Sequence, residues 1–191
     1  KLKVYCNEKE SLKTIFQNAI KEVRNIIGLN DSNHEEYYKL PTFAFIIARL
    51  SQRKLEYLIL GDCVMLVNDE QLTDHRVDRL FDLGKNEIEN SKKGLYVLNK
   101  KEILQKIRGL ANKEKGYWIG SLDDSSIEHA LYGNLEVTGD KIVLMSDGFY
   151  DYYSQNTTKS FEELIAMRKQ STELDPIYGK KDDASILVVE L

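Results

Sequence analysis

The sequence predicts an α+β fold in which antiparallel strands alternate with helices. Runs rich in β-branched and aromatic residues are separated by short polar turns, a pattern typical of hairpins. In other segments the apolar residues recur at helical spacing. The chain has 191 residues, 42% of them hydrophobic and 30% charged, which suits a folded protein with a sizeable core and excludes collagen-like or disordered chains. We expect a single domain over residues 1–191.

In the first third of the chain we predict one helix and one hairpin. Residues 8–27 carry a helical apolar stripe, with Asn7 and Glu10 as a capping box and Gly28 just past the end. After a polar loop, the runs 42–50 and 55–67 are predicted to pair as a hairpin. Their apolar density implies burial on both faces.

Further elements are predicted in the rest of the chain. Helices are expected at residues 77–88, 100–111 and 124–131. Strands are expected at residues 117–119, 141–146 and 184–191, the last two strongly apolar. Ser160 and Glu163 form a second capping box that should begin another helix.

Charge and cysteine usage exclude several classes of protein. The 27 basic and 31 acidic residues leave a net charge of -4, so we expect no nucleic acid partner. No apolar run approaches the roughly 20 residues that cross a bilayer, so we expect no membrane partner. Cys6 and Cys63 lie far apart and form no CxxC pair, which fits neither a disulfide framework nor a zinc site. We therefore expect a cytoplasmic location.

The segment 76–116 differs in charge from the rest of the chain. Its part from Lys85 to Lys115 carries nine basic and four acidic residues. The ordinary explanation is a solvated helical face. The alternative is a flap beside a site, where the positive charge attracts phosphorylated or acidic substrates.

Three strongly apolar strands have carboxylates at their ends. Asp62 follows one strand, Asp147 and Asp151 follow another, and Asp182 and Asp183 precede the last. Carboxylates gathered together repel one another, and hard divalent cations with oxygen ligands relieve that repulsion. Two such ions can activate a water for phosphoryl transfer. The alternative is that Gly-Asp and Asp-Gly simply mark turns after strands.

Four motifs in order resemble the PPM family of metal-dependent, PP2C-like Ser/Thr protein phosphatases. The most specific are SDGFYD and DDAS, each attached to its apolar strand. GDC stands where Gly-Asp-Ser is usual in the family, and LTDH is less specific. They lie within the segments GDC (61–63), QLTDH (71–75), VTGDKIVLMSDGFYD (137–151) and KKDDASILVV (180–189).

The resemblance implies a four-layer α-β-β-α sandwich of two antiparallel sheets, with 76–116 as a flap insertion. It implies that Asp147 and Asp182 bind a binuclear Mn²⁺ or Mg²⁺ centre, with Gly148 as a backbone neighbour. Asp62 and Asp151 match acids that some members use for a third, weaker ion. The implied substrate is a phosphorylated protein, hydrolysed by a metal-bridged water without a covalent intermediate.

The chain also departs from the family pattern. The opening motifs, which supply the first metal ligands, are missing before Pro41, and the chain starts at Lys1 rather than Met. We therefore expect an N-terminally incomplete domain with little activity alone, and unpaired sheet edges that could lead to oligomers. The alternative is an inactive PP2C-like pseudophosphatase that acts as a regulatory, protein-binding module.

Overall fold

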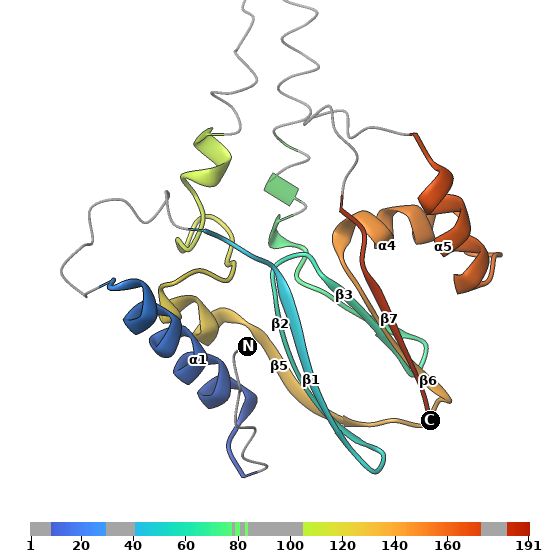
Figure 1. Ribbon diagram of the computed structural model, residues 1–191, viewed down its shortest axis with the longest axis horizontal. Helices are drawn as coiled ribbons and strands as arrows, with labels where there is room; N and C mark the ends of the chain where they lie inside the picture. The colour runs from blue at the N-terminus through green and yellow to red at the C-terminus, as the bar shows by residue number, and fades with distance from the viewer. Residues whose placement is uncertain (1–8, 30–40, 78, 81–82, 84–104, 173–182) are drawn as a thin grey trace, which may run out of the picture.

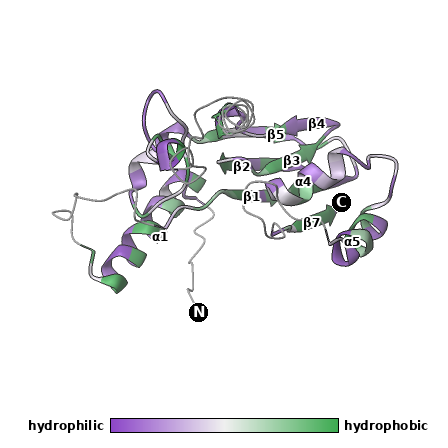
Figure 2. Ribbon diagram, turned by 90° about the horizontal axis from the view of Figure 1, so that it is seen from above, coloured by the Kyte–Doolittle hydropathy of each residue, from purple (hydrophilic) through white to green (hydrophobic). Residues whose placement is uncertain are grey.

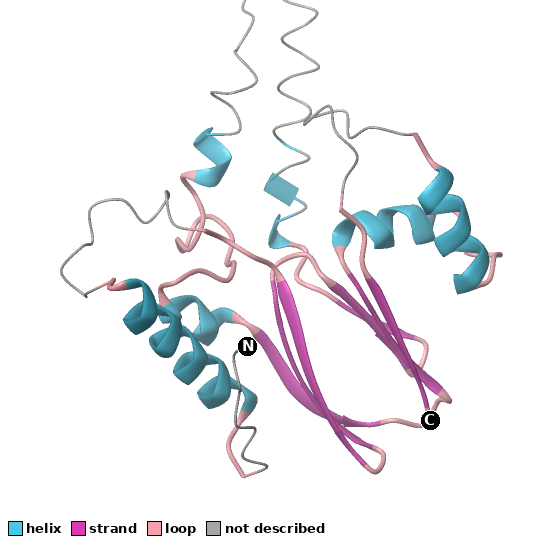
Figure 3. Ribbon diagram, viewed as in Figure 1, coloured by secondary structure: helices cyan, strands magenta, loops and turns pink. Residues whose placement is uncertain are grey.

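Two antiparallel sheets lie face to face between helices in the computed structural model, which describes residues 9–29, 41–77, 79–80, 83, 105–172 and 183–191 (Figures 1 and 3). The first sheet has the order β1-β2-β5 and consists of β1 (Phe45–Ser51), β2 (Lys54–Leu60) and β5 (Leu131–Glu136). The second has the order β4-β3-β6-β7 and consists of β3 (Val64–Val67), β4 (Glu70–Leu72), β6 (Lys141–Met145) and β7 (Ile186–Glu190).

Helices cover the outer face of each sheet. The first sheet packs against α1 (Leu12–Ile27), and the second against α4 (Asp147–Ser154) and α5 (Phe161–Gln170). This is the predicted α-β-β-α sandwich. Among the described residues, every helix falls short of the length and hydrophobicity that a bilayer span requires.

The alternation of side chains along the strands builds three apolar layers. Leu58 of β2 points outward, into a cluster with the buried α1 residues Leu12, Ile15, Phe16 and Ile20. The layer between the sheets contains Leu55, Ile59, Met65, Val67, Val137 and Ile142. The outer face of the second sheet contributes Val64, Val143 and Met145 to a cluster with Phe149 and Leu164. In Figure 2 hydrophobic residues run along β1, β2 and β7, and the hydrophilic β4 lies at an edge.

Helix α1 ends as predicted but begins later. The capping box of Asn7 and Glu10 is wrong, because residues 9–11 precede the helix and Ser11 is the N-cap, accepting a hydrogen bond from the Thr14 N–H. Gly28 ends the helix at φ 70°, and its N–H donates to the carbonyls of Arg24 and Asn25. The capping box of Ser160 and Glu163 at the start of α5 is confirmed.

Three other predictions need correction. The run 55–67 forms two strands, because the chain passes from the first sheet to the second at residues 61–63. Residues 117–119 form no strand and contribute only an isolated bridge, from Tyr117 to Ala111. The predicted helix 124–131 is a short 3-10 helix, η2 (Asp124–His129), which leads directly into β5. Most of 77–88 and part of 100–111 lie outside the described residues.

The Glu56 carboxylate joins α1 to the first sheet. It accepts hydrogen bonds from the Leu12 N–H at 3.3 Å, the Tyr132 hydroxyl at 3.0 Å and the Arg49 Nε at 2.9 Å. Arg49 also donates to the Glu10 carbonyl at 2.7 Å, just before the helix. Burial by itself raises the pKa of Glu56, but the hydrogen bonds from Arg49, Leu12 and Tyr132 outweigh it, so the pKa lies below its usual value.

Glu56→Gln should therefore destabilise the protein by about 1–3 kcal/mol at neutral pH, because the substitution removes charge-assisted hydrogen bonds around a buried group. A depressed carboxyl pKa stabilises the fold above its unfolded-state value and loses that effect as the pH falls through the folded-state value. The difference in unfolding free energy between wild type and variant should thus shrink below about pH 4.5. Urea unfolding of both proteins at pH 7 and pH 4 measures this difference. A difference that does not change with pH would contradict the role given to the Glu56 carboxylate.

Gly61→Ala should destabilise the protein more than Gly28→Ala. Both glycines have positive φ, 88° and 70°. A Cβ at Gly61 would lie 2.7 Å from the Ala44 Cβ, whereas one at Gly28 would meet nothing within 4 Å. Gly28→Ala should cost about 1–2 kcal/mol from backbone strain alone, and Gly61→Ala should exceed it because Ala44, just before β1, must also shift. Thermal unfolding of both variants tests this, and equal losses would contradict it.

Candidate functional site

The pairing of β3 with β6 brings two of the predicted site residues to one end of the second sheet. Val64 lies opposite Met145, the last residue of β6. Asp62 and Cys63 directly precede β3, Ser146 and Asp147 directly follow β6, and both Asp62 and Asp147 act electrostatically on the Cys63 thiol. Residues that follow different strands, far apart in the sequence, thus meet at one sheet end, which we call the site end.

Asp147 is the first residue of α4. A carboxylate in the first turn of a helix is stabilised by the helix dipole. Asp151 lies four residues later, so it shares a face of α4 with Asp147, and both are exposed. Gly148, between them, is buried.

Hydrogen bonds between two serines hold the start of β7 beside the start of α4. The Ser146 N–H donates to the Ser185 carbonyl at 3.0 Å, and the Ser185 N–H donates to the Ser146 Oγ at 3.0 Å. The segment that contains Asp183 therefore reaches the site end as well, where Asp183 is exposed. Asp182 lies outside the described residues.

The electrostatics of Cys63 reflect the charges at the site end. Burial raises the pKa of this thiol to about 12, with further contributions from the negative charges of Asp62 and Asp147. The negative charges of both carboxylates therefore lie close to the same thiol. The Cys63 thiol is protonated at neutral pH.

The donor chemistry at the site end suits a hard cation such as Mg²⁺ or Mn²⁺, which prefers carboxylate oxygens. Asp62 and Asp147 both supply such oxygens in the neighbourhood of Cys63. Within the described part of the chain, however, no three His, Cys, Asp or Glu side chains gather into a group able to hold a metal ion. The expected ligand Asp182 falls outside that part, so the described residues form only part of the predicted ligand set.

An ion pair that the sequence did not predict lies just after β4. Asp74, which is 8% exposed, accepts hydrogen bonds from the Arg76 Nε at 2.8 and 2.9 Å. Arg76 also donates to the His129 carbonyl at 2.8 Å, and the His129 ring stacks on Trp118 with centroids 3.4 Å apart. Asp74 lies within the QLTDH motif and Arg76 directly follows it, so this motif could have indicated the pair.

The two ends of the segment 76–116 meet next to this ion pair. Val77, Ile107 and Tyr117 form one buried cluster. The described part of the basic stretch carries exposed cations at Arg108, Lys113 and Lys115. The assignment of 76–116 as a flap insertion stays a prediction.

Comparisons with known proteins agree with this architecture. A structure described as a bacterial serine phosphatase is similar over 92% of this chain and 66% of its own, with 13% identity and a TM-score of 0.50. The catalytic domain of the serine/threonine protein phosphatase PstP, solved in complex with two manganese ions, matches over 90% of this chain and 64% of its own, with 14% identity and a TM-score of 0.43. The chain thus spans less than two thirds of the length of either structure.

Comparison with curated protein sequences found no match. The sequence profile of a family described as Protein phosphatase 2C matches residues 1–176. That match covers most of the chain, and the chain therefore belongs to the protein phosphatase 2C family.

Proposed function

We propose that this chain forms part of a metal-dependent protein serine/threonine phosphatase. The observation that carries the proposal is that Asp62 and Asp147, at the ends of the paired strands β3 and β6, both act electrostatically on the Cys63 thiol, in a chain of the protein phosphatase 2C family. Carboxylates gathered near one point repel one another, and a divalent cation bound there would relieve that repulsion.

We assign Asp147 and Asp182 as ligands of a binuclear Mn²⁺ or Mg²⁺ centre, and Asp62 and Asp151 as candidate ligands of a third ion. When bound, such ions lower the pKa of a coordinated water and neutralise the charge of a phosphate ester. The protein itself would hold the side chains of these ligands in position. The strands β3 and β6 hold the bases of Asp62 and Asp147, and α4 orients Asp147 and Asp151 along one face.

Cys63 supports hydrolysis by water rather than through a phosphocysteine. A cysteine nucleophile must be a thiolate, and the pKa of Cys63 is raised to about 12 by burial and by the carboxylates of Asp62 and Asp147. Those same carboxylates would repel an incoming phosphate if no cation were present. Cys63 is thus an uncharged side chain that lies near both carboxylates.

The proposed substrate is a phosphorylated protein. The exposed cations of Arg108, Lys113 and Lys115, together with the rest of the basic stretch 85–115, would raise the local concentration of such substrates. These cations would attract the negatively charged substrate over a distance, so added salt should weaken the attraction.

Asp147→Asn should lower the rate of Mn²⁺-dependent hydrolysis by the full-length protein at least about 100-fold. Substituting residues that only support metal ligands already lowers metal affinity or activity by up to about that factor. The measurement uses p-nitrophenyl phosphate and a phosphothreonine peptide, with Mn²⁺ binding followed by calorimetry. Glu190→Gln is the matched control, because the exposed Glu190 lies opposite Lys141 at the other end of the same sheet and its substitution should leave hydrolysis unchanged. A full-length protein that neither binds Mn²⁺ nor hydrolyses either substrate would contradict the proposal and favour a binding module.

Cys63→Ser should retain most of the Mn²⁺-dependent activity, because serine is similar in size and the thiol is protonated. For the same reason, iodoacetamide at pH 7.5 should not inactivate a Cys6→Ser variant, whose thiolate fraction at Cys63 would be on the order of 10⁻⁴ or less. Activity assays before and after alkylation give the answer. Loss of activity in both experiments would point to a cysteine nucleophile.

A further inference from the structure

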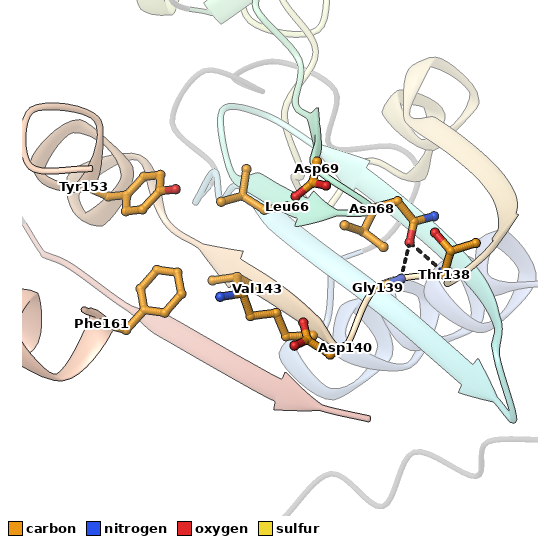
Figure 4. Close-up of a pocket in the computed structure, with 11 residues that line it drawn as sticks. Leu66, Asn68, Asp69, Thr138, Gly139, Asp140, Val143, Tyr153 and Phe161 are labelled. Carbon is orange, nitrogen blue, oxygen red and sulfur yellow. Dashed lines mark hydrogen bonds between the residues drawn. The ribbon is translucent and has the colours of Figure 1, made fainter. Parts of the chain in front are cut away.

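A groove lies at the end of the second sheet opposite the site end. It has a volume of about 480 Å³, within the range of ligand-binding clefts. One wall is apolar and consists of Leu66 and Val143 from the sheet with Tyr153 of α4 and Phe161 of α5 (Figure 4). Val143 is itself buried in the cluster beneath α4 and α5, whereas Leu66, Tyr153 and Phe161 are half-buried and form the accessible part of this wall.

The other wall of the groove is polar and rigid. Asn68 of the β3–β4 turn accepts hydrogen bonds at its Oδ1 from the N–H groups of Thr138 and Gly139, at 2.7 and 3.1 Å (Figure 4). Its Nδ2 donates to the Glu136 carbonyl at 2.7 Å. These bonds join the β3–β4 turn to the β5–β6 connection, so the polar wall is preformed.

Two carboxylates line this polar wall. Asp69 and Asp140 are both exposed, and neither side chain makes a hydrogen bond or ion pair with the described residues. The cation in the groove, Lys141, has carboxylates of its own nearby. It lies opposite Glu190 in the β6–β7 pairing and interacts electrostatically with Glu162, while its Nζ lies 5.5 Å from the centroid of the Phe161 ring. Asp69 and Asp140 outnumber Lys141 among the lining residues, so negative charge still predominates beside the apolar wall.

We propose that this groove is a docking site for a partner peptide that carries lysine or arginine next to a bulky apolar side chain. The apolar side chain would pack against Tyr153 and Phe161, and the cationic group would reach Asp69 and Asp140. The long aliphatic stem of arginine or lysine suits a path along the apolar wall to a charged rim. An acidic peptide would meet the uncompensated carboxylates and be rejected.

Docking here would not compete with chemistry at the site end. Asp69 and Asp140 lie beyond Val67 and Lys141, whereas Asp62 and Asp147 lie beyond the opposite ends of the same two strands, β3 and β6. The inference therefore holds or fails independently of the proposed phosphatase activity.

The test is an NMR titration of the ¹⁵N-labelled chain, without metal or phosphate, with the acetylated and amidated hexapeptide Gly-Leu-Arg-Leu-Arg-Gly. We expect saturable shifts concentrated at Asn68, Thr138, Gly139 and Phe161, with a dissociation constant below about 1 mM. The same peptide with glutamate in place of arginine should produce no saturable shifts. Raising NaCl from about 50 to about 500 mM should weaken binding, because the attraction is electrostatic.

Asp69→Asn combined with Asp140→Asn should raise the dissociation constant at least about tenfold. Asparagine tolerates the positive φ of 62° at position 69, so the turn should survive. The matched control removes two exposed carboxylates elsewhere, Glu22→Gln with Glu114→Gln, and should leave binding unchanged. Equal binding of the glutamate peptide, no saturable shifts at the groove, or unchanged binding by the Asp69/Asp140 variant would each overturn the proposal.

Discussion

The pairing of β3 with β6 is the interaction on which both the core and the candidate site depend. These are the two inner strands of the second sheet. A slip of one residue would turn Met65 and Ile142 from the layer between the sheets to the outer face. The same slip would separate Asp62 from Asp147. Because one register serves both purposes, the apolar burial that stabilises the sandwich also supplies the energy that holds two like charges together.

Two carboxylate–arginine pairs, one with a half-buried and one with a buried carboxylate, connect the flanking segments to this sandwich. Glu56 with Arg49 holds the start of α1, and Asp74 with Arg76 holds the start of the segment 76–116. Each arginine also donates to a backbone carbonyl of another segment, at Glu10 or His129. Removing one partner of such a pair leaves a buried charge without compensation. The pairs therefore constrain where the flanking segments leave the sheets.

The two ends of the second sheet carry different chemistry. At the site end, strand ends and the first turn of α4 present carboxylates around a buried thiol. At the other end, tight turns and the half-buried side chains of Leu66, Tyr153 and Phe161 form a groove with an apolar wall and an acidic rim. The strands between them are short and buried, so they act as rigid spacers. A protein built this way can bind a partner at one end and leave the other end free for chemistry.

Local patterns in the sequence determined the elements with strong short-range signals. The stripe of α1 with Gly28, the β1–β2 hairpin, the apolar β6 with Asp147 at its end and the Ser160 cap all follow from spacing and capping chemistry. The sequence did not predict β5, whose alternation is brief and contains Gly133, where the Tyr57 hydroxyl from the neighbouring strand packs against the backbone. Nor did it predict the split of residues 55–67 between two sheets or the Asp74–Arg76 pair. Only the tertiary structure decides which strands pair, and in which register, because that choice depends on contacts between residues far apart in the chain.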